Sequence, residues 1–97
     1  MTYVLIAKWT AKEGEEDNVR AALEQLAGPT RAEPGCLMWQ PQVDAENPRV
    51  FVIYEQYVDE AALGEHAASD HFKRIGLEDA IPRLESRERA FYETFAE

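Results

Sequence analysis

The chain has 97 residues, the length of one domain, so we expect residues 1–97 to form a single domain. Nineteen acidic and ten basic residues give a formal net charge of −9 at pH 7, which argues against nucleic acid or an anionic membrane surface as a partner, because either would require a basic patch. The single cysteine excludes an internal disulfide and a cysteine-rich zinc site, and without a signal pattern or a long apolar run we expect a cytoplasmic protein.

A strand and a helix are predicted first. Residues 3–10 are rich in aromatic and β-branched side chains, which is typical of a strand. After a break at residues 12–14, a helix is predicted from about Glu15. Its apolar face recurs every three or four residues: Val19, Ala22, Leu23, Leu26, Ala27 and Thr30. Pro29 removes a backbone hydrogen bond, so we expect a kink or a stop there, with a further turn through Glu33.

A turn and two strands follow. Pro34-Gly35 predicts a type II turn, because proline presets one dihedral angle and glycine accepts the positive one. Residues 36–43 and 49–58 predict two strands, and residues 44–48 predict the hairpin loop that joins them.

Helical segments and a final strand complete the chain. Asp59 is a good N-cap for a short helix, and Ser69-Asp70 is placed to cap a second helical segment. After a connection over residues 84–88, residues 89–95 predict the last strand. The order β-α-β-β-α-β predicts an α+β fold of the ferredoxin-like type, a four-stranded antiparallel sheet with helices on one face.

The predicted strands are apolar on both faces. In the third strand, both faces carry apolar residues. One face has Val50, Val52, Tyr54 and Val58, and the other has Phe51, Ile53 and Tyr57. The helices can cover only one face, and monomers rarely expose a large apolar patch. We therefore expect a homodimer in which the sheet of one copy packs on the sheet of the other.

Two histidines are the candidate catalytic groups. His66 falls on the apolar side of its helix, where its imidazole would point towards the sheet and exchange a proton near neutral pH; the alternative is a core histidine bonded to a carbonyl or a tyrosine. His71 begins the next segment and is either a polar contact or solvated. A spacing of five suits a metal pair poorly, and no third ligand accompanies the histidines, so we expect no metal site.

Other residues have two possible roles each. Glu55 interrupts an apolar strand, so its carboxylate must be paired, solvated or in a cavity, and Arg31 and Arg49 are candidate partners. Cys36 lacks a base and is expected to be a small buried hydrophobe. Four aromatic residues are candidates either for a pocket between sheet and helices or for the core: Trp9, Trp39, Tyr54 and Phe72.

Three runs of sequence resemble the antibiotic biosynthesis monooxygenase domain family: residues 31–37, 54–57 and 62–72. The likeness covers nearly the whole chain. It implies a dimeric α+β barrel of ferredoxin-like protomers. Oxygenase members oxidise quinols or aromatic polyketides with dioxygen as co-substrate and without metal, flavin or haem, so no cofactor is expected.

The resemblance also implies roles for individual residues. His66 would be the base or the hydrogen-bond partner of a phenol. Ring-stacking walls would come from Trp39, Tyr54 and Phe72, and secondary polar contacts from His71 and Arg31. The first strand lacks the asparagine of the haem-degrading branch, and Gly76 falls where that branch has its haem-ligating histidine, so a haem oxygenase is not expected.

Two functions of other classes stay open. One is a non-catalytic, dimeric ligand-binding or stress-response module, which would bind aromatic ligands in the same pocket without consuming oxygen. The other is an isomerase of a small phosphorylated or lactone metabolite. An isomerase would require cationic groups at the pocket, for which the sequence offers Arg31, Lys73 and Arg74.

Overall fold

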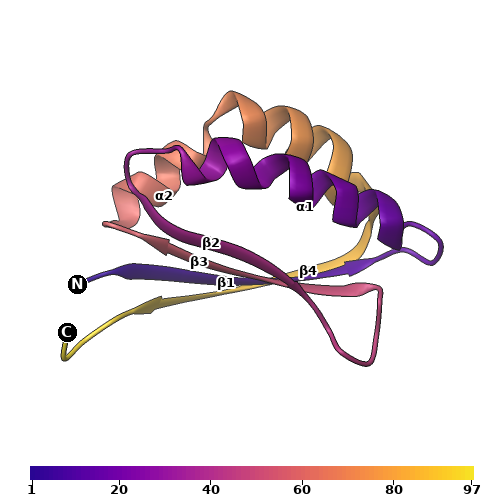
Figure 1. Cartoon of the computed structure of the whole chain (residues 1–97), viewed down its shortest axis with the longest axis horizontal. Helices are drawn as coiled ribbons and strands as arrows, with labels where there is room; N and C mark the ends of the chain where they lie inside the picture. Colours follow the sequence, from indigo (N-terminus) through magenta and orange to yellow (C-terminus); the bar gives the residue numbers. More distant parts are fainter.

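The computed structural model describes residues 1–97 as one antiparallel sheet with a layer of helices on one face (Figure 1). Its elements are β1 (Tyr3–Ala11), α1 (Glu16–Arg31), β2 (Cys36–Val43), β3 (Val50–Tyr57), α2 (Glu60–Ala67), the π-helical η1 (Phe72–Ala80), the 3₁₀ turn η2 (Ile81–Arg83) and β4 (Leu84–Glu93). The strand order is β2-β3-β1-β4. This confirms the ferredoxin-like α+β fold.

The core lies between the helices and one face of the sheet. From α1, Val19, Leu23 and Leu26 are almost completely buried, and they face Phe51 and Ile53 of β3 within one apolar cluster. Fully burying a side chain of this size stabilises the fold by about 1.5–3 kcal/mol. None of the helices is both long enough and apolar enough to span a bilayer.

The other face of the sheet has no helix over it. Alternation along the strands places Val52 and Tyr54 of β3 on this face, beside Ile6 of β1 and Tyr92 of β4. The Tyr92 side chain is half exposed. The Tyr54 hydroxyl accepts a hydrogen bond from Gln56 Nε2 at 2.9 Å. The strands are thus apolar on both faces, as predicted.

Two elements, α1 and β4, differ from the prediction by more than one residue at their ends. α1 runs through Pro29 to Arg31, so of the two expected outcomes, a kink or a stop, the stop does not occur; Pro29 lies in the last turn, where Thr30 is completely buried. β4 begins at Leu84 and ends at Glu93, whereas we predicted residues 89–95. Its charged residues resemble a solvated connection in the sequence, but β4 is an edge strand that pairs only with β1, which tolerates them.

The turn before β2 also differs from the prediction. Gly14 is the only glycine with a positive φ, so Gly35 does not form a type II turn. Its role is steric, because a Cβ atom at Gly35 would lie 2.5 Å from Cβ of Ala62 in α2. The Gly35 carbonyl also accepts a hydrogen bond from Val58 N at 2.9 Å. Glycine therefore allows this turn to lie directly against α2.

We predict that Gly35→Ala destabilises the protein by about 1–3 kcal/mol, because the added methyl group must push the turn away from α2. The matched control is Gly64→Ala, whose new Cβ meets nothing within 4 Å. That change should stabilise α2 by about 0.5–1 kcal/mol. Urea unfolding at one fixed protein concentration measures both values. Equal stability of Gly35→Ala and the wild type would contradict the close approach.

Candidate active site

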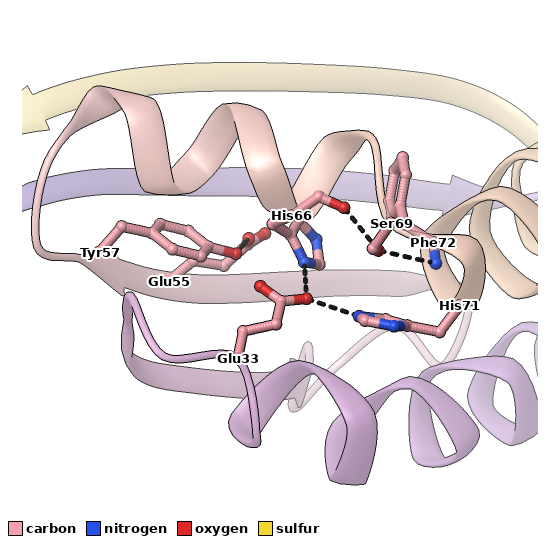
Figure 2. A network of polar contacts seen from close by, with 7 residues as sticks. All are labelled: Glu33, Glu55, Tyr57, His66, Ser69, His71 and Phe72. Carbon is pink, nitrogen blue, oxygen red and sulfur yellow. Dashed lines mark hydrogen bonds and ion pairs between the residues drawn. The ribbon is translucent and has the colours of Figure 1, made fainter.

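One carboxylate joins three segments of the chain (Figure 2). Glu33 follows α1, His66 lies in α2, and His71 immediately precedes η1. Oε2 of Glu33 is 2.9 Å from Nδ1 of His66 and 2.5 Å from Nε2 of His71. Because an ionised carboxylate only accepts hydrogen bonds, we place a proton on both ring nitrogens that face it.

This contact defines the chemistry of His66. With its proton on Nδ1, the neutral imidazole keeps an unprotonated Nε2, which forms no hydrogen bond within the chain. Burial lowers the pKa of His66 below its usual value, although the hydrogen bond to Glu33 acts in the opposite direction. The ring is therefore neutral at pH 7, and Nε2 is available as a base.

The local sequence fixes where His66 and Phe72 lie. Asp59 caps α2 by accepting a hydrogen bond from Ala62 N at 2.9 Å, as predicted. At the other end, Ser69 Oγ donates to the His66 carbonyl at 2.7 Å and accepts from Phe72 N at 3.2 Å. These bonds join α2 to η1, and the rings of His66 and Phe72 lie 5.0 Å apart.

A cavity of about 100 Å³ lies beside this ring. Its wall is mostly apolar and comes from β1, α2 and η1: Leu5, Ala7, Trp9, Leu63, Ala67 and Phe72. Four polar residues complete it: Glu55, His66, Arg87 and Arg89. His66 is the only histidine at the cavity, so a potential base faces space large enough for a small ring.

Glu55 is a second group that exchanges protons at this cavity. Its carboxylate is buried and accepts a hydrogen bond from the Tyr57 hydroxyl at 2.6 Å. Burial raises the pKa of Glu55 to about 7, and it raises the pKa of Tyr57 as well. The predicted ion pairs are wrong, because Arg31 binds the Trp39 carbonyl and Arg49 binds Glu85 and the Ala11 carbonyl.

The structure brings together only part of the predicted site. His66 and Phe72 line the cavity, and His71 reaches it only indirectly, through Glu33. Trp39 and Tyr54 do not line this cavity. Trp39 is packed in the core on the β2 side of the sheet, and Tyr54 points to the opposite face because side chains alternate along β3.

Arg31 also lies outside the cavity. Its guanidinium donates two hydrogen bonds to the Trp39 carbonyl, at 3.0 and 2.9 Å, which ties the end of α1 to β2. Sequence reasoning missed Glu33 at the histidines and both arginines of β4. A signal for the arginines was present in the sequence: Arg87 and Arg89 are two residues apart, so in a strand their side chains lie on the same face.

The three residues around Glu33 also form a possible metal site. Their ligand atoms all lie within 4.8 Å of one another, so a third ligand accompanies the histidines after all. The reason we gave for excluding a metal was therefore wrong. However, ligands 2.0–2.1 Å from a tetrahedral zinc ion lie about 3.3 Å apart. Contacts of 2.5 and 2.9 Å to Glu33 Oε2 are those of hydrogen bonds, which favours protons here.

We predict that Glu55→Gln removes a pH-dependent loss of stability. Because the folded pKa of Glu55, about 7, lies above the unfolded value of 4.5, folding takes up a proton. The free energy of unfolding that this protonated Glu55 contributes is fully present below about pH 4.5 and is lost as the pH rises through 7. The loss for the wild type is on the order of 3 kcal/mol. Glutamine keeps an acceptor for Tyr57 and cannot ionise.

Urea unfolding from pH 4.5 to 8.5 measures this difference. The stability of Glu55→Gln relative to the wild type should rise across the range, whereas the exposed control Glu78→Gln should follow the wild type. A difference between Glu55→Gln and the wild type that does not change with pH would show that Glu55 is not a protonated buried acid.

Comparisons with known proteins agree with this fold. The family model described as "Antibiotic biosynthesis monooxygenase" matches residues 2–76. The Mycobacterium tuberculosis protein named "Putative monooxygenase Rv0793" is 32% identical over 68 residues, which cover 70% of this chain and 66%, just under two thirds, of that relative.

Solved structures extend the likeness to nearly the whole chain. PA3566 from Pseudomonas aeruginosa is 33% identical with a TM-score of 0.88, covering 98% of this chain and 95% of that one. SO0527 from Shewanella oneidensis is 33% identical with a TM-score of 0.87, and the match covers 94% of this chain and 88% of that one. The chain therefore belongs to the antibiotic biosynthesis monooxygenase family.

Proposed function

We propose that this protein is a monooxygenase that oxidises a quinol or a related phenol with dioxygen as co-substrate and without a metal or organic cofactor. Membership of the family supports a monooxygenase-like function in general. The observation that carries the specific proposal is the neutral imidazole of His66, held at Nδ1 by Glu33 while its ring lines a cavity with Trp9 and Phe72.

The first step is a proton transfer. Nε2 of His66 takes the proton of a phenolic hydroxyl, and the positive charge that develops on the ring is stabilised by the Glu33 carboxylate. His71 donates to the same oxygen of Glu33, which holds that carboxylate in place against His66. Glu55, with a pKa of about 7, is a second proton acceptor at the cavity.

The deprotonated ring is then rich enough in electrons to react with dioxygen. One electron passes to dioxygen, the semiquinone radical and superoxide combine through a new C–O bond, and the O–O bond breaks. The proton held by His66 passes to the outer peroxide oxygen, and the C–H bond at the oxygenated ring carbon breaks, so that its proton completes the water that leaves. A hydroquinone and dioxygen thereby give a hydroxyquinone and water, and the substrate supplies all four electrons. The apolar wall shelters the radical pair from solvent.

A homodimer is part of this proposal. The uncovered face of the sheet carries apolar side chains, including Val52 and Tyr92, and a domain of this size gains stability by burying them. We propose that two copies pack these faces together. A species of 11.1 kDa at micromolar concentration in sedimentation velocity would contradict the dimer.

We predict that His66→Ala lowers the rate of quinol oxidation by about 10²–10⁴-fold, because the substrate loses its base. Oxygen uptake with a chemically reduced quinone measures the rate, after subtraction of the reaction without enzyme. Tyr54→Phe is the control, because Tyr54 lies on the opposite face of the sheet from the cavity, and it should keep the wild-type rate. Sedimentation should match the wild type for both variants.

Two results would contradict the proposal. Unchanged turnover in His66→Ala would remove the base from the mechanism. Loss of turnover after exhaustive chelation, with recovery on adding a metal ion, would make Glu33, His66 and His71 metal ligands and overturn the claim that no cofactor is required.

An isomerase of a small anionic metabolite is the second candidate, because Arg87 and Arg89 supply the cationic groups that such a site would require. His66 would then move a proton between two positions of the substrate without dioxygen. Oxygen uptake separates the two functions, since an isomerase consumes none. Binding with neither oxygen uptake nor product would identify a ligand-binding module.

A further inference from the structure

We propose that the substrate of this cavity carries an anionic group, which Arg87 and Arg89 bind at the rim while the ring lies against Trp9 and Phe72. The inference deepens the proposed function and rests on it for the aromatic part of the substrate. It adds the charge of the substrate class, which neither the family match nor the names of the relatives specify.

The register of β4 places both arginines at the cavity. Arg87 lies opposite Trp9 of β1, and Arg89 lies opposite Ala7, so both share the helix-facing side of the sheet. No helix packs extensively on β4, whereas α2 packs on β3 and α1 packs on β2 and η1. Both residues are exposed and line the same cavity, so they lie where the cavity meets solvent.

Neither arginine has an acidic partner. Arg49 pairs with Glu85, and Arg83 pairs with Glu15 and Asp79, but the side chains of Arg87 and Arg89 form no ion pair or hydrogen bond in a chain of net charge −9. The guanidinium of Arg89 lies only over the Phe91 ring, at 5.6 Å from its centre. Two positive charges therefore remain unpaired side by side at the cavity.

The two arginines also repel each other. Burial lowers the pKa of Arg87, and the charge of Arg89 lowers it further. Such an arrangement costs free energy in the empty protein, because like charges on neighbouring positions of one face are unfavourable. An anion between them would offset this cost, and guanidinium groups match the oxygens of a carboxylate or a phosphate.

The size of the cavity explains where the anion must lie. A volume of about 100 Å³ has room for little more than one ring, so any substituent has to extend through the open edge, past Arg87 and Arg89. The ring would then place its hydroxyl towards His66 and its anionic group towards β4. The same positive charges would favour the phenolate that His66 produces.

Binding of ligands that do not react with oxygen tests this inference separately from turnover. We would titrate the protein with 4-hydroxybenzoate, with its neutral amide 4-hydroxybenzamide, and with phenyl phosphate, by calorimetry at low and high salt. We expect the acid to bind about tenfold more tightly than the amide, and the advantage to shrink at high salt. Phenyl phosphate distinguishes a phosphate from a carboxylate as the favoured anion.

Substitutions then locate the effect. Arg87→Gln and Arg89→Gln should each remove most of the preference for the anion and leave binding of the amide unchanged. The control is Arg74→Gln, an exposed arginine of η1 outside the cavity, which should bind all ligands like the wild type.

Equal affinity for acid, phosphate and amide would overturn the inference. So would no binding at millimolar concentration, or a preference that survives in the Arg87→Gln, Arg89→Gln double variant. If the variants do not fold, the preference of the wild type and its salt dependence decide alone. None of these results depends on whether His66→Ala affects oxygen uptake, so the inference and the proposed function can fail separately.

Discussion

The hydrogen bonds between the Glu33 carboxylate and the two histidines are the interaction on which the candidate site depends. Glu33 precedes a turn that lies against α2 only because Gly35 has no side chain to meet Ala62. This close approach brings the carboxylate to Nδ1 of His66 and so determines which nitrogen of His66 carries its proton. A steric detail of one turn thus sets the acid–base chemistry of a cavity formed by other elements.

The electrostatics of the cavity differ from those of the rest of the surface. The protein is strongly acidic, yet its cavity combines a neutral histidine, a glutamic acid with a pKa of about 7 and two unpaired arginines. Burial is the main cause of the shifted pKa values of both His66 and Glu55. Groups that exchange protons near neutral pH, gathered at one cavity, are typical of a site that moves protons.

The sequence predicted the fold because the aromatic and β-branched strands, the apolar face of α1 and the Asp59 cap are local signals, and it predicted His66 because that residue interrupts an apolar helix face. It could not predict Glu33, which reaches His66 across 33 positions through a turn whose path depends on packing. Nor could it tell which face of β3 the helices cover, which decides that Tyr54 lies away from the cavity. Arg87 and Arg89 resemble solvated residues until the register of β4 with β1 is known.

The proton position on His66 is open to direct measurement. Long-range ¹H–¹⁵N correlation spectra of the wild-type protein distinguish the two tautomers of a neutral imidazole and follow their titration with pH. We expect His66 to carry its proton on Nδ1 at pH 7 and to titrate below its usual range, with Nε2 unprotonated. A proton on Nε2 at pH 7, or a ring that is already charged there, would contradict the role of Glu33 and leave the cavity without a base.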